Sequence, residues 1–397
     1  MKVLLVHSFY RSENPSGENR VYHDELTLLE ANGIEVRSFT RKSDDMLRLG
    51  PAAALLGALS TPWNPRAARL LRQEVDRFRP DVVHVHNTFP WISPAIFHAV
   101  GRRAARVLTL HNYRLFCPAA IPVRQAHLCT ECIDQRSVWP ALRHACYRNS
   151  RVATLPLAAG VALHRALGTW THEVDAFITL SEFQRRLMVG AGLPAEKVHI
   201  KPNFVAGNPP VVDWDQRGNY AIFVGRLSSE KGLRTLLQAW RQWGAGAPEL
   251  RIVGDGPMRA ELEAEAAGSS IRFLGRLENG ATRAQIGAAR LLIMPSEWIE
   301  TFGLALAEAF AFGTPVAVSD IGPLSTIARD GQEGVVFPPG DAPRLLHTVR
   351  RAWNDPELLR RLGGSARLAF ETLYNEAANF RDLMQVYERA MQVSRHE

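Results

Sequence analysis

The chain has 397 residues, of which 46% are hydrophobic and 22% are charged, so it is long enough for two globular domains and has the composition of a soluble protein. Its formal net charge is +7, and the excess lies in the first half: residues 1–205 hold 26 Lys and Arg against 17 Asp and Glu, whereas the rest holds 21 against 23. No zinc-finger or RNA-binding signature accompanies the basic residues, so nucleic acid is the least favoured partner, and an anionic membrane surface or a solvated arginine-rich surface are the two interpretations.

No segment is long and apolar enough to span a membrane. The longest uncharged, mostly apolar run is VATLPLAAGVAL, residues 152–163, whereas a spanning helix needs about 20 residues. The N-terminal MKVLLVHSFYRSE reads as a first strand and lacks the longer apolar core of a secretory signal. We therefore expect a cytoplasmic protein. The basic first half and the apolar stretches 51–59 and 152–163 add the expectation of peripheral contact with the inner membrane face.

Strands and helices alternate along the first half. The apolar strand candidates are residues 2–7, 34–39, 81–86, 105–111 and 175–180. Between the first two, ENRVYHDELTLLEANG has the apolar spacing of a helix and a glycine stop at Gly33. Near-continuous Val, Ile and Leu runs are typical of buried parallel strands, so these segments predict one parallel sheet.

A second alternation of the same kind follows a segment rich in Pro, Gly and Asn. The expected strands are residues 220–225, 250–254, 271–275, 290–295 and 315–319, and the expected helices begin near Lys231, Pro257, Ala281, Phe302 and Pro323. Long helical segments run from Ala342 to the end.

These patterns predict an α/β protein with two doubly wound domains facing each other across a crevice. The expected division is an N-terminal acceptor domain at 1–203 with a cysteine-rich insert at about 114–150, a linker at 204–219, a donor domain at 220–374, and a final helix at 375–397 that packs back toward the N-terminal domain. Ligands of such sheets bind outside the carboxyl ends of the strands.

The segment FVGRLSSEKG, residues 223–232, places basic side chains between a strand and a helix. Arg226 and Lys231 would lie beside a helix N-terminus, where backbone N–H groups and the helix dipole attract anions such as a diphosphate. The alternative is an ordinary exposed loop. A second turn, IVGDGP at 252–257, has Arg259 where a dinucleotide fingerprint has its third glycine, which argues against a dehydrogenase.

Two glutamates, Glu300 and Glu308, lie in the otherwise apolar segment EWIETFGLALAEAFAFGTPV, residues 297–316. Burying an unpaired carboxylate is costly, so each must reach water or a polar partner. We expect Glu300 before the N-terminus of a helix and Glu308 about two turns into it, both held by the hydroxyl groups of a bound polyol. The alternative, a dipole partner and a solvated helix glutamate, has equal weight on these residues alone.

All four cysteines fall in one short window with the spacing C-x11-C-x2-C-x13-C. Cys117, Cys129, Cys132 and Cys146 could supply four thiolates to a structural zinc ion, and four unlinked thiols are the alternative. Stable disulfides are not expected without a secretory signal.

Two further polar patterns are better explained without a metal. His84 and His86 share one face of a strand, and packing is favoured over metal binding there. Asp213 and Asp215 have an Asp-x-Asp spacing but lie in the linker, so we interpret them as solvated loop acids.

Taken together, the EKG, GDGP and E-x7-E motifs resemble the retaining glycosyltransferases of family four, which have the GT-B fold. The resemblance covers nearly the whole chain and includes DVVHVHN, LTLHNYRLFCP, ITLSEF and KPNF. It implies two Rossmann-like domains. It also implies retention of anomeric configuration without a protein nucleophile, and no metal or other cofactor required for catalysis. The leaving diphosphate would accept the proton of the acceptor hydroxyl group, and basic side chains would stabilise its growing charge.

The resemblance also implies roles for individual residues. Arg226 and Lys231 would hold the donor diphosphate, Glu308 the ribose, and Arg276 and Leu277 the base. His111 would lie at the donor sugar and the acceptor. Glu300 and the backbone of the four residues that follow it would hold the donor sugar: Thr301, Phe302, Gly303 and Leu304. Four residues of other loops would complete the donor site: Gly17, Gly225, Gly254 and Asp255.

Three positions depart from the family pattern. The first loop has Ser16-Gly17 in place of paired glycines, the fourth strand is followed by His111-Asn112 in place of His-Asp, and Asn203-Phe204 stands where the family often has Asn-Gly. These departures concern the roles of single loops and leave the class unchanged.

The resulting expectation is a hexosyltransferase. It would move a sugar from a UDP- or GDP-sugar to a glycan or lipid-linked acceptor in cell-surface polysaccharide biosynthesis. Two alternatives remain: a nucleotide-sugar epimerase or hydrolase on the same fold, which would need no acceptor, and a non-catalytic protein that binds sugar nucleotides.

Overall fold

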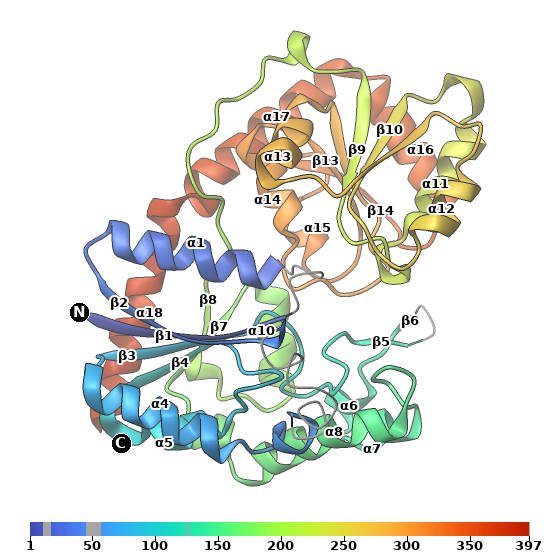
Figure 1. The fold of residues 1–397 in the computed structure, drawn as a ribbon. Helices are drawn as coiled ribbons and strands as arrows, with labels where there is room; N and C mark the ends of the chain where they lie inside the picture. Colours follow the sequence, from blue (N-terminus) through green and yellow to red (C-terminus); the bar gives the residue numbers. More distant parts are fainter. Residues whose placement is uncertain (11–16, 45–56, 125–126, 397) are drawn as a thin grey trace. The chain divides into compact units, whose positions relative to one another are not determined.

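The structure is a computed structural model that describes residues 1–10, 17–44, 57–124 and 127–396. The chain forms two compact units (Figure 1). The first unit contains residues 1–122, 129–202 and 379–397, and the second contains 123–128 and 203–378.

The first unit is built on a six-stranded parallel sheet with the order β2-β1-β3-β4-β7-β8. Its strands are β1 Lys2–Phe9, β2 Glu35–Lys42, β3 Val82–Asn87, β4 Ala105–Thr109, β7 Ala176–Thr179 and β8 Val198–Ile200. Its helices are α1 Gly17–Ala31, α4 Pro65–Phe78, α5 Ala95–Val100, α6 Glu131–Asp134, α7 Trp139–Arg143, α8 Arg151–Ala166, α9 Thr169–His172 and α10 Glu182–Gly190. Every residue of β3 and β4 is buried, as expected for central parallel strands covered on both faces.

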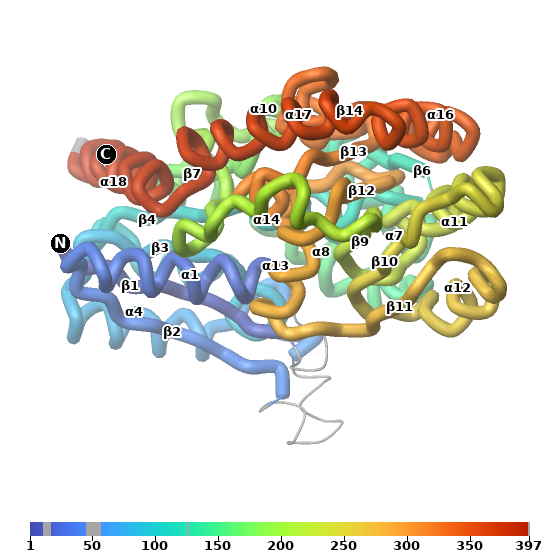
Figure 2. Tube along the Cα trace, turned by 90° about the horizontal axis from the view of Figure 1, so that it is seen from above, coloured from blue at the N-terminus to red at the C-terminus, as the bar shows by residue number. Residues whose placement is uncertain are grey.

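The last helix, α18 Glu376–His396, completes the core of the first unit. Leu383, Tyr387 and Ala390 pack in one cluster with Val3 and Val107 of the sheet. Both views of the chain show α18, in red, alongside the strands of this sheet (Figures 1 and 2). The two ends of the chain therefore share one hydrophobic core.

The second unit repeats the design with the strand order β11-β10-β9-β12-β13-β14, again all parallel. Its strands are β9 Tyr220–Val224, β10 Glu249–Val253, β11 Ile271–Gly275, β12 Leu291–Met294, β13 Val316–Ser319 and β14 Gly334–Phe337. Its helices are α11 Leu233–Trp243, α12 Arg259–Glu265, α13 Asn279–Ala288, α14 Leu304–Ala311, α15 Leu324–Ile327, α16 Ala342–Trp353 and α17 Pro356–Ala369. A separate two-stranded antiparallel hairpin joins β5 Val123–Arg124 to β6 His127–Leu128.

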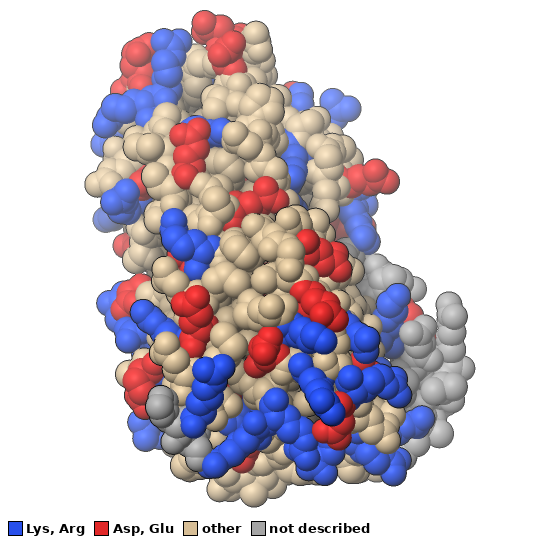
Figure 3. Space-filling model, turned by 90° about the vertical axis from the view of Figure 1, so that its left-hand side faces the viewer, with Lys and Arg blue, Asp and Glu red and all other residues tan. Residues whose placement is uncertain are grey.

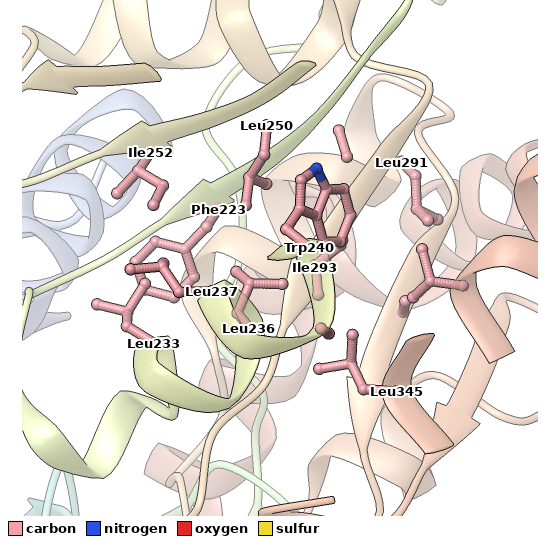
Figure 4. Packing of buried hydrophobic residues seen from close by; sticks show 14 of the residues in the cluster. Phe223, Leu233, Leu236, Leu237, Trp240, Leu250, Ile252, Leu291, Ile293 and Leu345 are labelled. Atoms are coloured by element: carbon pink, nitrogen blue, oxygen red, sulfur yellow. The ribbon is translucent and has the colours of Figure 1, made fainter. Parts of the chain in front are cut away.

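The core of the second unit forms around α11 (Figure 4). Trp240 is almost fully buried, and its indole N–H donates to the carbonyl oxygen of Pro248 at 2.9 Å. Leu233, Leu236 and Leu237 extend the same apolar face of the helix toward Phe223 and other strand residues. This packing fixes the helix directly after the basic loop that ends β9.

All ten strands expected from the sequence are present, which confirms the α/β prediction. The expectation missed β8 and β14, which lie at the edges of the two sheets and are short. The run VHI of β8 contains a histidine and the run GVVF of β14 begins with a glycine, so neither has the continuous apolar pattern that predicts the other short strands. No helix in the described ranges has the length and apolar character needed to cross a membrane.

Candidate active site

In the second sheet, the order in which strands are added reverses once, between β9 and β12. From β9 the chain adds β10 and β11 on one side, and then crosses to add β12 on the other. In an open α/β sheet, ligands bind at such a switch point, outside the carboxyl ends of the strands. The two loops that leave these strand ends carry Arg226 and Lys231 on one side and Glu300 on the other.

Lys231 and Glu300 form an ion pair across the switch point. The Lys231 Nζ donates to Glu300 Oε1 at 2.6 Å, and the Ser296 hydroxyl donates to the same oxygen at 2.8 Å. Glu300 is only 6% exposed. The sequence led us to expect a bound polyol as its polar partner, but side chains of the protein already partner the carboxylate, which offsets the cost of burying it.

Trp298 lies beside this pair. The Lys231 Nζ is 5.2 Å from the centroid of the Trp298 ring, a cation–π distance. The Trp298 indole N–H is buried, and no acceptor for it is present among the described residues. An unsatisfied buried donor is rare and is often found where a ligand or water binds.

The glycines of these loops allow close backbone approach. Gly232 has a φ of 68°, and a Cβ added there would lie 1.8 Å from the carbonyl oxygen of Pro295. Gly254 has a φ of 140°, and its Cβ would lie 1.8 Å from the carbonyl oxygen of Gly225. Loop packing therefore explains Gly232 and Gly254 by itself. The roles of Gly225 and Gly254 in donor binding stay predictions.

Glu308 is held by a residue that the sequence did not suggest. Arg283 of α13 donates through Nε to Glu308 Oε1 at 3.3 Å, and the Glu308 side chain is buried. Helix α14 begins at Leu304, two residues later than expected, because Gly303 has the left-handed φ of 92°. Glu308 therefore lies about one turn into the helix, and the expected two turns were wrong.

The remaining predicted donor residues differ in exposure. Arg226, Asp255 and Arg276 are exposed, Thr301 and Leu277 are partly exposed, and Phe302 is buried. Asp255 pairs with Arg259 at 3.5 Å. The structure thus brings Lys231 and Glu300 together directly, and it places the exposed cations on loops at the same edge of the sheet.

In the first unit, His111 follows β4 and lines a cavity of about 80 Å³. Its polar lining residues include Asn87, Asn112 and Arg114. Its apolar lining residues are Phe89, Pro90, Pro94, Phe97, Leu108, Leu110, Leu115, Leu157, Val161 and Trp170. A mostly apolar cavity with a few convergent polar groups has the character of a small-molecule site.

Protein packed around His111 disfavours its protonated form. Burial, followed by the neighbouring imidazoles of His86 and His7, holds the pKa of His111 well below its usual value. The ring is therefore neutral at physiological pH. Gly17 is exposed at the start of α1, and a Cβ there would meet nothing within 4 Å. The preceding loop, residues 11–16 with Ser16, lies outside the described residues.

Glu18 is a site residue that the sequence analysis missed. Asn87 donates to Glu18 Oε1 at 2.8 Å, and Asn112 donates to Oε2 at 3.5 Å. Burial raises the pKa of Glu18 to about 7, against the opposing effect of Arg114. Nothing in the sequence marked this residue, because a glutamate in the first turn of a helix is ordinary.

The four cysteines of the window form no disulfide bond. Cys117 and Cys132 are buried, and Cys129 and Cys146 are partly exposed. Burial, together with the nearby thiols, raises the pKa of Cys117 to about 12 and that of Cys132 to about 11. Within the described ranges, the group of metal-ligand atoms that lies within 4.8 Å is Glu25, His84 and His86, and no three of the four sulfurs are that close.

Comparison with known proteins identifies the family. Residues 15–206 match the sequence model described as "Glycosyltransferase Family 4", and residues 208–369 match "Glycosyl transferases group 1". The O-antigen chain mannosyltransferase C of Escherichia coli is 26% identical over an alignment of 396 positions, which covers 94% of this chain and 94% of its own. The D-rhamnosyltransferase WbpZ of Pseudomonas aeruginosa is 33% identical over 160 residues, 39% of this chain and 41% of WbpZ.

Solved structures support the fold. Sucrose-phosphate synthase from Thermosynechococcus elongatus has a TM-score of 0.69 at 19% identity, covering 98% of this chain and 99% of its own. Anabaena HepE in complex with UDP and glucose has a TM-score of 0.66 at 16% identity, covering 98% and 100%. The chain has the GT-B fold and belongs to glycosyltransferase family 4, so it is a glycosyltransferase.

Proposed function

We propose that this protein transfers a hexosyl group from a UDP- or GDP-sugar to a glycan or lipid-linked acceptor in the assembly of a cell-surface polysaccharide, with retention of configuration. The observation that carries the proposal is the Lys231–Glu300 pair at the switch point between β9 and β12. Two bacterial relatives, named O-antigen chain mannosyltransferase C and D-rhamnosyltransferase, support the polysaccharide assignment.

The pair suggests how the donor is received. A diphosphate would offer Lys231 a partner with more charge than one carboxylate, and exposed Arg226 would bind from the same loop. Glu300 would then be released to accept hydrogen bonds from sugar hydroxyl groups. A ligand oxygen would also satisfy the buried indole N–H of Trp298.

The proposed reaction needs no nucleophile from the protein and no metal ion. The bond between the anomeric carbon and the diphosphate oxygen breaks, and a bond to the acceptor oxygen forms on the same face of the sugar. The proton of the acceptor hydroxyl group moves to the departing diphosphate oxygen. Lys231 and Arg226 would stabilise the negative charge that develops on that diphosphate.

Membrane contact is a finer part of the proposal. Figure 3 shows Lys and Arg gathered over part of the face that it draws. Helix α8 of the first unit also exposes Val152 and Leu155. The stretch 51–56 lies outside the described residues. We expect the protein to float with vesicles of anionic lipid and to stay behind with vesicles of neutral lipid, and absence from both would contradict cytoplasmic peripheral attachment.

We also propose a structural zinc ion in the cysteine window. A tetrahedral ion with Zn–S bonds of about 2.3 Å needs sulfurs about 3.8 Å apart, so the four side chains would have to close around it. Three non-glycine residues inside this window and two directly after it have a positive φ, and a zinc tether would help to hold such a backbone: Ala120, Arg136 and Ala145; Arg148 and Asn149. Metal analysis should find about one zinc per chain; no zinc, with stability unchanged by chelator, would remove the site.

The donor proposal is tested by thermal shift with UDP, GDP, ADP, CMP and their sugar conjugates. A ligand that binds only the folded state at about 100 times its dissociation constant adds about 2.7 kcal/mol of stability. We expect a shift with one base, lost in Lys231→Ala and kept in Arg351→Ala, which removes an exposed cation of α16. No shift with any nucleotide would contradict the proposal.

Product analysis separates the two alternatives from transfer. A nucleotide-sugar epimerase or hydrolase would convert the donor without an acceptor, and a non-catalytic binding protein would give a thermal shift without turnover. The proposed transferase releases the nucleoside diphosphate much faster when an acceptor is present. Proton NMR of the anomeric position of the product then shows whether the configuration is retained.

A further inference from the structure

Behind His111, the first unit contains a buried polar network that the reaction described above does not use. Its members come from four parts of the chain: Glu25 of α1, His84 and His86 of β3, Lys201 after β8, and Tyr387 of α18. All five side chains are nearly inaccessible to solvent. Polar groups at such depth destabilise a fold unless they are hydrogen-bonded, so the direction of each bond is informative.

Glu25 is the fixed end of the network. Its Oε2 accepts from Lys201 Nζ at 2.8 Å, and its Oε1 lies 2.9 Å from His84 Nδ1 and 3.1 Å from His86 Nε2. Burial alone would raise the pKa of Glu25, but Lys201 and the two imidazoles outweigh burial and hold that pKa well below its usual range. An ionised carboxylate only accepts hydrogen bonds.

The direction of the remaining bonds follows from this acceptor. Because Glu25 accepts, His86 must donate through Nε2, and a neutral imidazole then has an unprotonated Nδ1. His86 Nδ1 lies 3.0 Å from His111 Nε2, so His111 must donate through Nε2. The two rings are inclined by only 18° with centroids 5.2 Å apart, which suits a hydrogen bond between ring edges.

We propose that Glu25 and His86 are positioning residues that hold His111 with its proton on Nε2 and its Nδ1 as a hydrogen-bond acceptor. The tautomer follows from these distances alone; only the statement that His111 faces a hydroxyl group of the acceptor or of the donor sugar rests on the proposed function. The chain of bonds sets orientation and tautomer, and no proton needs to move along it.

A metal ion is a weaker explanation of the same cluster. The ligand atoms of Glu25, His84 and His86 are close enough for one ion, but the Lys201 ammonium already contacts the carboxylate. A second cation would be repelled at this distance. His84 also has its own partners, Tyr387 at 2.8 Å and Thr109 at 2.7 Å, which fix its ring in a hydrogen-bonding role.

The Lys201 ammonium is also held by a residue of α18. Lys201 Nζ donates to Asn379 Oδ1 at 3.2 Å, and Asn379 donates to the carbonyl oxygen of Pro202 at 2.7 Å. The ammonium that keeps Glu25 ionised therefore has a second partner, supplied by α18. This arrangement leaves Glu25 little freedom to change its acceptor role.

The test is a long-range ¹H–¹⁵N spectrum of the full-length protein labelled with ¹⁵N-histidine at neutral pH. Such spectra distinguish protonated from unprotonated ring nitrogens, and His111→Gln identifies the His111 signals. We expect Nε2 protonated and Nδ1 unprotonated. A His111 ring protonated on Nδ1 in the unsubstituted protein would overturn the inference. This result needs neither a functional variant nor an activity measurement.

His86→Phe provides the second readout. Without the His86 acceptor, His111 should exchange between tautomers, and kcat should fall by about tenfold, the effect of losing one ordinary hydrogen bond, with the donor KM nearly unchanged. His199→Gln, a substitution on β8, is the matched control and should leave both readouts as they are. An unchanged tautomer in a folded His86→Phe protein would also overturn the inference. An unsubstituted protein that has the expected His111 tautomer but transfers no sugar would instead count against the proposed function and leave the inference standing.

Discussion

Glu25 of the first unit and Glu300 of the second are both buried carboxylates, but their surroundings differ. Glu25 contacts one ammonium and two imidazoles, which are themselves held by α18 and β4. Glu300 contacts one lysine and one serine on the loops of a strand end. The Lys231 side chain is 20% exposed, whereas that of Lys201 is 1% exposed. The first arrangement has more partners and less exposure, and the second is the one that we expect a ligand to displace.

The largest effect is expected from Lys201→Met. This change leaves the Glu25 carboxylate buried without its ammonium, which typically costs about 3–5 kcal/mol. Urea unfolding measures the loss, with Lys2→Met as an exposed control. Lys201→Met combined with Glu25→Gln removes both charges and should recover much of the stability. A single variant as stable as the starting protein would show that the network is not ionised as described.

Lys231→Met should lower the free energy of unfolding less than Lys201→Met does, but it should also weaken the binding of nucleotide. Its partner Glu300 keeps the Ser296 hydroxyl, and the Lys231 side chain is itself 20% exposed, so we expect the free energy of unfolding to fall by about 1–3 kcal/mol. Loss of one charged hydrogen bond to the diphosphate should weaken nucleotide binding by about 10- to 100-fold. Isothermal titration calorimetry measures the second effect. Equal affinities of Lys231→Met and the unsubstituted protein would remove Lys231 from the donor site.

Acid should destabilise the first unit before the second. Burial lowers the pKa of His84 to about 4 and that of His7 to about 3, while the unfolded chain protonates histidine at its ordinary value of 6.5. A depressed histidine pKa means that stability is present above pH 6.5 and is lost as the pH falls toward 4. Hydrogen exchange at pH 7 and pH 5 should therefore show loss of protection in β1 and β3. Equal loss in β9 and β12 would contradict this expectation.

The smallest effect on stability is expected from Glu18, and its dependence on pH is opposite to that of the two histidines. Burial raises the pKa of Glu18 to about 7, so its ionised form opposes folding above that pH and its protonated form does not. Glu18→Gln mimics the protonated form. The variant should therefore gain more in melting temperature, relative to the unsubstituted protein, at pH 8 than at pH 5. An equal difference in melting temperature at pH 8 and pH 5 would show that ionisation of Glu18 does not oppose folding.

The sequence predicted the sheets well because buried parallel strands are long apolar runs. It also predicted the loops that end β9 and β12, since glycines and charges interrupt those runs. It did not predict the start of α14, because the left-handed φ of Gly303 depends on its tertiary surroundings. Periodicity reports which faces are buried, but it does not report which distant polar groups meet.

The two polar clusters illustrate that limit. Glu25 lies on an ordinary amphipathic helix, and its partner Lys201 is 176 positions away. Arg283, the partner of Glu308, lies on a helix with no marked motif. His84 and His86 were recognised as a pair, and the favoured interpretation was packing. The hydrogen-bonding role became visible only when α1 and β3 were placed side by side.

Hydrogen exchange of the second unit with and without bound nucleoside diphosphate tests the central claim most directly. The base is chosen as the one that shifts the melting temperature. The account predicts the strongest added protection in residues 225–232 and 296–304, the two loops that carry Lys231 and Glu300. Saturating nucleotide that leaves both loops unprotected, with protection elsewhere, would contradict the assignment of this strand edge as the donor site.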